Sequence, residues 1–366
     1  MPRGRQDRAT LQSLAAELGV SAKTVSNAFT RPDQLSAGLR ERVLATAERL
    51  GYAGPDPLAA GLRRGRVGAL GFAYANPLPY AFEDPVIIEL LAGITSVAEQ
   101  AGTGLLLVPG SASPNRAVAA LHAAVVDGLV ANSLAADDPV LLAALSRGLP
   151  LVVVDQPEPQ KIRDRHGQPT PWIGIDDSAG AASAAEHVLS LGHRHLGVVS
   201  FPMHRGAERG FVDLSAQERT AYAVTRQRLA AYRAAATRAG IDWSSVPVAT
   251  GNDSTATEGA AAASALLDRE PRTTALLCLS DRLAEGALQA AAERGLEVPT
   301  DLSVIGFDDA DPAARLQLTT IGHPHRRKGE FAATALLDLL AGRRPPPRQV
   351  LPTSLVARSS TAPPRR

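Results

Sequence analysis

The chain has 366 residues, 45% of them hydrophobic and 20% charged, which is too long for one compact core and indicates two or three globular domains. Its net charge of +1 hides an asymmetry: residues 1–66 carry 11 Lys and Arg against 6 Asp and Glu, a net of +5, whereas the remaining 300 carry 27 against 31, a net of −4. A basic N-terminal segment before a mildly acidic remainder suggests that the segment binds a polyanion. The single cysteine excludes an intrachain disulfide.

The chain begins with two short predicted helices. Apolar residues recur at helical spacing from about Thr10, a suitable N-cap, to Leu18. Gly19 can end this helix in the left-handed conformation, and Ser21 is a good N-cap for a second helix that runs through Thr30. Two helices joined by so tight a turn must cross steeply, which is the helix-turn-helix arrangement.

The second helix separates an apolar face from a polar face. Val25, Ala28 and Phe29 are suited to packing against the first helix. The opposite face is small or hydrogen-bonding, as a helix entering the major groove requires, and consists of Ala22, Lys23, Ser26 and Asn27. A third helix is expected from Ser36 to Gly51, so the alternative interpretation is a three-helix bundle without a nucleic-acid role.

Residues 10–27 and 42–52 closely resemble the lac repressor/galactose repressor (LacI) family of bacterial transcription regulators, and the resemblance continues through nearly the whole chain. It implies that Ala22, Lys23 and Asn27 read bases of a palindromic operator in double-stranded DNA as part of a homodimer. Lysine can donate to guanine and asparagine can bind adenine bidentately, so we expect Lys23 and Asn27 to carry sequence choice. The family often has arginine at the position of Asn27, so the operator should differ from the most familiar ones.

A short helix is possible just after this region. Asp56-Pro57 is typical of a helix start, but the segment Leu58–Arg64 is too short to be stable alone. The resemblance implies a hinge helix that forms on operator DNA and inserts Leu62 into the minor groove. An ordinary interdomain linker is the alternative.

From residue 67 onward, short apolar strands alternate with helices, which predicts parallel sheets covered on both faces. The expected strands are Val67–Tyr74, Gly104–Pro109, Gly128–Ala131, Pro150–Val154, Trp172–Ile175, His195–Ser200, Thr274–Ser280 and Ser303–Phe307. The expected helices are Val86–Ala101, Arg116–Val126, Val140–Arg147, Ser178–Ser190, Arg219–Ala239, Glu258–Asp268, Leu283–Gly295 and Arg327–Leu340.

The expected fold class is therefore an all-α helix-turn-helix domain followed by an α/β domain of two lobes with two parallel sheets, like a periplasmic binding protein. The expected domains are 1–54 for DNA binding, 55–66 for the hinge, and 67–366 for effector binding and dimerisation. The lobes are discontinuous: lobe 1 spans about 67–172 and 323–350, and lobe 2 spans about 173–322 and 351–361.

Acidic and hydroxyl residues stand where several predicted strands end, which is where open α/β sheets bind ligands. They are Asp155, Asp176, Asp177, Ser280, Asp281, Asp308 and Asp309. Such acceptors suit a polyhydroxylated effector such as a sugar.

The resemblance implies effector contacts by Asp155, Arg228, Ser280 and Asp308, although the family usually has asparagine where Ser280 and Asp177 stand. Arg228 lies in a segment that matches the family only approximately, and a surface helix charge is the alternative for it. Tyr80 and Phe82 follow the first strand and could stack on a ring or pack the mouth of the cleft.

Other function classes have weaker support. The chain shows no nucleophile elbow, Walker loop or zinc spacing, so we expect no catalytic activity, no cofactor and no metal. His193 and His195 are expected in a turn, Cys278 as a buried thiol, and Phe201–Glu218 as an insertion without an assigned role. Because no signal peptide or transmembrane span is visible, we expect a cytoplasmic protein. A solute-binding protein or an α/β enzyme that uses the same cleft without DNA is the alternative.

Overall fold

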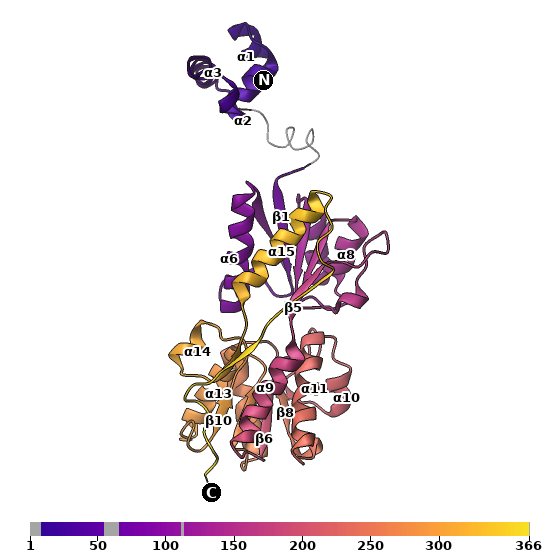
Figure 1. Cartoon of the computed structure of the whole chain (residues 1–366), viewed down its shortest axis with the longest axis vertical. Helices are drawn as coiled ribbons and strands as arrows, with labels where there is room; N and C mark the ends of the chain where they lie inside the picture. The colour runs from indigo at the N-terminus through magenta and orange to yellow at the C-terminus, as the bar shows by residue number, and fades with distance from the viewer. Residues whose placement is uncertain (1–8, 55–65, 111–112, 366) are drawn as a thin grey trace, which may run out of the picture. The chain divides into compact units, whose positions relative to one another are not determined.

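The computed structural model describes residues 9–54, 66–110 and 113–365. These belong to two compact units, residues 1–68 and 69–366 (Figure 1). The predicted hinge, with Asp56-Pro57 and Leu62, lies outside the described residues. Among the residues that are described, no helix is both long and apolar enough to cross a bilayer.

The N-terminal unit contains the predicted helix-turn-helix. Its helices are α1 (Leu11–Leu18), α2 (Ala22–Thr30) and α3 (Ala37–Arg49), with the short 3-10 helix η1 (Pro32–Gln34) between the last two. The Thr10 hydroxyl accepts from the amide of Ser13, and Gly19 ends α1 with φ of 65°, as expected. Leu14, Val25 and Val43, one from each α-helix, are fully buried and form the centre of a small core.

The first lobe of the second unit is built on a six-stranded sheet with the order β12-β5-β4-β3-β1-β2, in which all neighbours run parallel. Its strands are β1 (Ala69–Tyr74), β2 (Gly104–Val108), β3 (Gly128–Asn132), β4 (Leu151–Val154), β5 (Trp172–Ile175) and β12 (Arg348–Leu351). Its helices are α5 (Leu78–Ala81), α6 (Pro85–Gln100), α7 (Pro114–Ala123), α8 (Pro139–Arg147), η2 (Pro159–Lys161) and α15 (His325–Leu340).

Helices cover both faces of this sheet. Along β4, Val152 and Val154 belong to the apolar cluster that includes Leu90 of α6 and Leu336 of α15. The intervening residues of β4 face the other way, into the cluster that contains Leu141 of α8. This alternation is what a parallel sheet buried on both sides requires.

The second lobe has a five-stranded sheet with the order β10-β9-β6-β8-β7, in which only β7 is antiparallel to its neighbour. Its strands are β6 (Leu196–Ser200), β7 (Gly210–Phe211), β8 (Val248–Thr250), β9 (Ala275–Cys278) and β10 (Ser303–Ile305). Its helices are α9 (Asp177–Ser190), α10 (Leu214–Glu218), α11 (Ala223–Arg238), η3 (Trp243–Ser245), α12 (Ala256–Arg269), α13 (Asp281–Glu293) and α14 (Asp311–Arg315).

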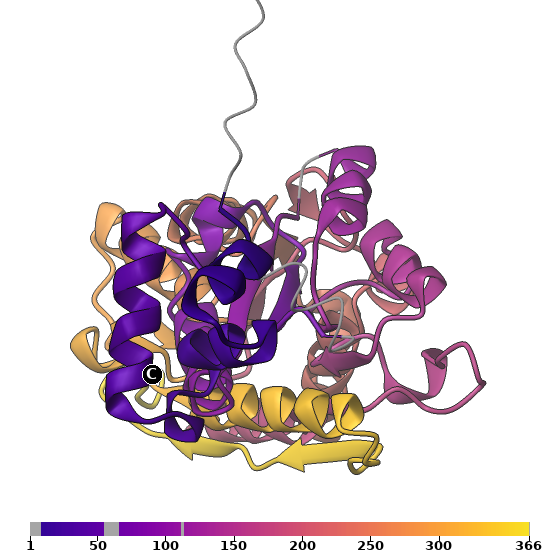
Figure 2. The same cartoon turned by 90° about the horizontal axis from the view of Figure 1, so that it is seen from above.

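The chain crosses between the lobes three times. The first crossing leads from β5 to α9, the second from β11 (Thr320–Gly322) to α15, and the third from β12 to β13 (Ser354–Val356). At the second and third crossings β11 and β13 pair antiparallel. In Figure 2 these late segments run along one side of the unit. The predicted return to the first lobe through the helix near Arg327–Leu340 matches α15.

The predicted border near residue 172 is wrong by a few residues. It assigned Ile173–Ile175 to the second lobe, whereas β5 pairs in parallel with both β4 and β12 of the first sheet. A short apolar strand has the same pattern in either sheet, so the sequence alone could not assign it.

Pairs of glycines let helices approach closely in both lobes. In the first lobe, a Cβ added to Gly93 of α6 would lie 1.9 Å from the carbonyl oxygen of Arg326, and one added to Gly329 of α15 would lie 2.1 Å from that of Leu90. In the second lobe, a Cβ on Gly286 of α13 would lie 2.0 Å from a carbonyl oxygen of α12. Backbone therefore meets backbone where these helices cross.

Candidate functional site

The polar face of α2 is partly exposed to solvent in the N-terminal unit. Lys23 is exposed, while Ala22, Ser26 and Asn27 are half-buried. The Ser21 hydroxyl accepts from the amide of Thr24 and caps the helix. The buried residues of α2, Val25 and Ala28, lie on the opposite face, as predicted.

Asn27 has a partner that the sequence did not indicate. Its Nδ2 donates to Oε1 of Gln34 in η1 at 3.2 Å. The hydrogen bond orients the Asn27 amide from outside α2, so η1 supports the face that is the candidate reader of bases.

The second unit contains a cavity of about 200 Å³ between its two lobes. Five of the six predicted effector residues line it: Tyr80, Asp155, Arg228, Ser280 and Asp308. Phe82 is not among the described residues that line this cavity, and its side chain is 64% exposed. Phe82 follows α5 and points away, whereas Tyr80, inside that one-turn helix, is buried.

Arg228 is buried in the cleft and is not a surface charge of α11. Its side chain is 6% exposed, and its Nε donates to Oδ1 of Asp177 at 2.8 Å. Its Nη1 donates to the carbonyl oxygen of Leu279 at 2.5 Å, and its Cζ lies 3.5 Å from the centroid of the Phe307 ring. Burial raises the pKa of Asp177, and the positive charge of Arg228 opposes that shift.

Asp308 lies beside this arginine, with its carboxylate 3.9 Å from Arg228 Nη1. Burial raises the pKa of Asp308 well above its usual range, against the lowering effect of Arg228. His323 Nε2 is 3.4 Å from the Asp308 carboxylate, and His325 Nε2 is 2.8 Å from its carbonyl oxygen, so Nε2 donates in the neutral ring. Both histidines come from the return into the first lobe, so Asp308 is held from both sides of the cleft.

Asp155 pairs with Lys328, which is not among the predicted site residues. The ammonium of Lys328 is 2.9 Å from both carboxylate oxygens of Asp155, and the lysine side chain is 2% exposed. A signal was present, because Lys328 shares the apolar stripe of α15 with Ala332 and Leu336 at helical spacing. A charged residue on a buried face of a helix needs an ion-pair or hydrogen-bond partner, so Lys328 could have been recognised from the sequence.

Several buried polar atoms of the cavity have no hydrogen-bond partner among the described residues. They are Asn132 Oδ1, Arg282 Nη1 and His323 Nδ1, and all three residues line the cavity. The Arg282 guanidinium lies over the Tyr80 ring, with Cζ 4.7 Å from the ring centroid. Because an unpaired buried polar atom is costly, these atoms indicate hydrogen-bonding capacity that a ligand can use.

Several side chains cross the mouth of the cleft. The Tyr80 hydroxyl donates to the carbonyl oxygen of Ser254 at 2.6 Å, and Asn76 Nδ2 donates to the carboxylate of Asp253 at 3.2 Å. Tyr80 thus packs at the mouth of the cleft, one of its two predicted roles, and also joins the lobes.

Ser280 both lines the cavity and caps a helix. Its hydroxyl accepts from the amide of Leu283 and caps α13, and it lies 3.0 Å from the hydroxyl of Ser254. The adjacent Asp281 accepts from Thr320 Oγ1 at 2.6 Å and from the amide of Ala310 at 2.8 Å. Burial raises the pKa of Asp281 to about 7 in spite of these hydrogen bonds.

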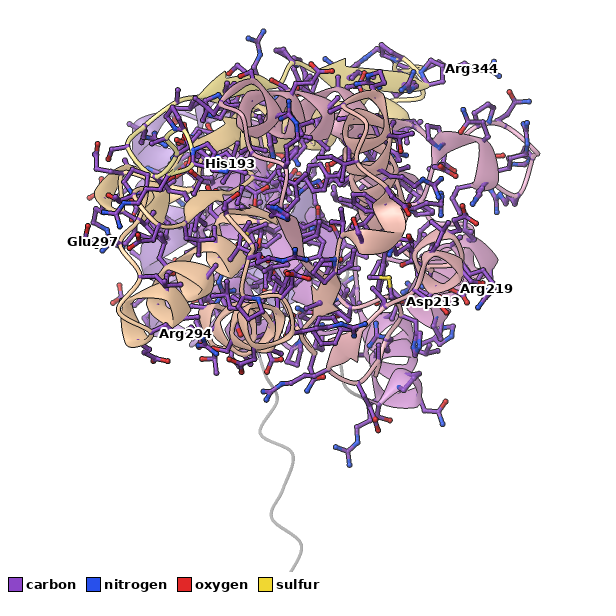
Figure 3. All side chains as sticks on the ribbon, turned by 90° about the horizontal axis from the view of Figure 1, so that it is seen from below. His193, Asp213, Arg219, Arg294, Glu297 and Arg344 are labelled. Carbon is purple, nitrogen blue, oxygen red and sulfur yellow. The ribbon has the colours of Figure 1, made fainter. Side chains whose placement is uncertain are left out.

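His193 and Cys278 have structural roles. The ring nitrogens of His193 bond to Thr274 Oγ1 at 2.9 Å and to the carbonyl oxygen of Ala362 at 2.8 Å, so the ring fixes the C-terminal segment, and Figure 3 labels it. Cys278 is fully buried in β9, and burial raises the pKa of its thiol far above the usual range.

Residues 185–361 match the family described as the periplasmic binding protein-like domain. An HTH-type transcriptional regulator of Mycobacterium tuberculosis is 44% identical over 365 residues, covering 98% of this chain and 98% of that protein. The HTH-type transcriptional regulator IpsA of Corynebacterium glutamicum is 38% identical over 363 residues, covering 98% of this chain and 99% of that protein.

Solved structures give the same picture. A LacI-family transcriptional regulator from Corynebacterium glutamicum matches with a TM-score of 0.75 at 36% identity, covering 98% of this chain and 100% of that one. The lac repressor dimer bound to operator and the anti-inducer ONPF matches with a TM-score of 0.74 at 28% identity, covering 97% and 100%. The complex of the transcriptional regulator CelR with cellobiose matches with a TM-score of 0.68 at 27% identity, covering 96% and 100%.

Proposed function

Because this chain belongs to the lac repressor/galactose repressor (LacI) family of DNA-binding transcription regulators, we propose that it is a dimeric, cytoplasmic repressor controlled by a small polyhydroxylated effector. The observation that carries the proposal is the cavity of about 200 Å³, in which three buried polar atoms have no hydrogen-bond partner among the described residues, within a chain that also has a helix-turn-helix unit. The relatives are transcriptional regulators, in agreement with the expectation that the chain is not an enzyme.

The chemistry of the cavity supports the class of effector. Asn132 Oδ1 can only accept a hydrogen bond and Arg282 Nη1 can only donate one, so a hydroxyl, which does both, satisfies either atom. The carboxylates of Asp155 and Asp308 add further acceptors on the same lining. The CelR complex with cellobiose supports a carbohydrate-like ligand.

The candidate DNA contacts are Ala22, Lys23, Ser26 and Asn27 on α2, together with Leu62 in the predicted hinge. The lac repressor dimer bound to operator supports a dimer on palindromic DNA. In such a dimer two recognition helices occupy half-sites about one helical turn apart, roughly 34–36 Å. An effector that changes the closure of the lobes changes the spacing of the two recognition helices and therefore the affinity for operator.

Replacing Lys23 with alanine is expected to weaken binding to the preferred operator by about 1–3 kcal/mol, while random duplex is affected much less. The reason is that Lys23, exposed on the polar face of α2, reads a base edge as well as neutralising phosphate. Genomic selection supplies the operator, and competitive gel shifts at fixed salt measure both affinities. Lys161→Ala, which removes an exposed lysine of the other unit, is the matched control. Equal weakening of operator and random duplex by Lys23→Ala would contradict the assignment.

A ligand screen tests the proposal as a whole. We expect at least one sugar or related polyhydroxylated metabolite to raise the melting temperature, since a ligand at 100 times its Kd stabilises a protein by about 2.7 kcal/mol. The same compound is expected to change the operator affinity. If the intact protein shows no salt-dependent preference for any genomic duplex, the regulator proposal fails. If it binds DNA but only compounds without several hydroxyl groups shift the melting temperature, the class of effector is wrong.

A further inference from the structure

The segment Phe201–Glu218, which the sequence marks as an insertion, begins at the cleft. Phe201 and Pro202 line the cavity. The carbonyl oxygen of Met203 accepts from Thr220 Oγ1 at 2.7 Å and from the amide of Ala221 at 3.0 Å, so the start of the segment is bound to residues that come just after its end. Figure 3 labels Asp213 and Arg219, the residues that flank α10 at its two ends. The segment is an ordered part of the second lobe whose base reaches the ligand cavity.

Arg205 in this segment reaches across to the first lobe. Its Nη2 donates to Oδ2 of Asp138 at 2.9 Å and to the carbonyl oxygen of Ala75 at 3.3 Å. Ala75 directly follows β1, and Asp138 is the N-cap of α8, with its Oδ1 accepting from the amide of Val140 at 2.9 Å. One guanidinium therefore binds two separate segments of the opposite lobe.

Because Asp138 is buried, the loss of this ion pair is expected to cost free energy. The Asp138 side chain is 5% exposed, so water hydrates its carboxylate poorly, and the partner from the other lobe compensates for this. The Arg205 side chain is 38% exposed, so salt can still screen the interaction. Opening the lobes separates the two charges and leaves the Asp138 carboxylate without this cation.

We propose that Arg205 is a positioning residue that latches the lobes closed when no effector is bound. This inference rests on the proposed function, because it concerns a cleft that binds an effector. The latch determines the fraction of effector-free molecules in which that cleft is already closed. The apparent Kd of a ligand that requires the closed cleft is the intrinsic Kd divided by that fraction. Arg205 thus sets effector affinity through the equilibrium between open and closed lobes.

Hydrogen exchange can report the closure directly. The amide of Val224, at the start of α11 in the second lobe, donates to Oε1 of Gln156 in the first lobe at 3.2 Å. Gln156 is itself held there, because its Nε2 donates to the carbonyl oxygen of Ser133. Exchange of the Val224 amide, measured on the full chain without effector or DNA, therefore reports separation of the lobes.

Arg205→Ala is expected to speed exchange at Val224 about tenfold, the scale for a hydrogen bond to a charged group. Arg209→Ala is the matched control, because Arg209 lies in the same segment but pairs with Glu258 inside the second lobe. Asp138→Asn keeps an oxygen for the cap of α8 and is expected to match Arg205→Ala. The double variant should be no faster than either single variant. High salt should speed exchange more in the parent chain than in Arg205→Ala, in which the partly exposed pair Arg226–Glu158 still joins the lobes.

The latch is disproved if Arg205→Ala leaves exchange at Val224 unchanged, or if Arg209→Ala speeds it equally. Because neither DNA nor effector enters this experiment, such a result leaves the proposed regulator function standing. Loss of operator binding or of every ligand response would instead overturn the proposed function, whatever the exchange rates.

Discussion

Replacing Arg228 with methionine is expected to abolish the response to effector and to lower the free energy of unfolding of the second unit by about 3–5 kcal/mol. The substitution keeps much of the apolar stem but leaves the buried carboxylate of Asp177, 4% exposed, without its cation. It also removes the hydrogen bond to Leu279 and the guanidinium from the face of Phe307. Urea unfolding followed by tryptophan fluorescence measures the loss, since both tryptophans, Trp172 and Trp243, lie in this unit.

A double variant separates the two effects of that change. Arg228→Met with Asp177→Asn removes both charges, so most of the lost stability should return. The effector response should stay absent, because the proposed ligand contact is still missing. A loss below about 1 kcal/mol in the single variant would show that Asp177 does not depend on Arg228.

The second large effect is expected where α6 crosses α15. Gly93→Val is expected to lower the free energy of unfolding by about 3 kcal/mol or more, the range of severe core overpacking. A Cβ at this position would lie 1.9 Å from the carbonyl oxygen of Arg326, so the helices must move apart. Urea unfolding monitored by the same fluorescence provides the measurement.

Ala92→Val is the control for this experiment. It introduces the same β-branched side chain one position earlier in α6, where Ala92 is half-buried, and is expected to cost less than about 1 kcal/mol. If both variants lose the same stability, helix propensity rather than the close crossing explains the result.

Much of the fold could be predicted because local signals agreed with one another. Thr10 and Gly19 mark the ends of α1 by cap chemistry that depends on no distant contact. The apolar strands and the acidic residues after them indicated parallel sheets and a cleft at their carboxyl ends, and Asp155 and Asp308 do line the cavity. These features depend on the period of the pattern and on sheet geometry alone.

The missed features depend on contacts between distant parts of the chain. Lys328 reaches Asp155 across 173 residues, so nothing near either residue specifies the pair. Arg282 and Asn132 are ordinary polar residues until the fold brings them to one cavity. Phe82 and Tyr80 are two residues apart in the sequence, yet only Tyr80 lines the cavity, because α5 directs the two side chains differently.

The late position of α15 and β12 in the chain has a consequence for how the protein is made. The second lobe has its five strands once Ile305 has left the ribosome, but the first lobe still lacks a helix and an edge strand at that point. Until residue 340 emerges, α6 lacks α15, the helix whose Gly329 packs against the backbone of Leu90 and Ile94 in the finished protein. The lobe that is synthesised first is thus completed last, and its exposed apolar face is where we expect chaperones to bind the nascent chain.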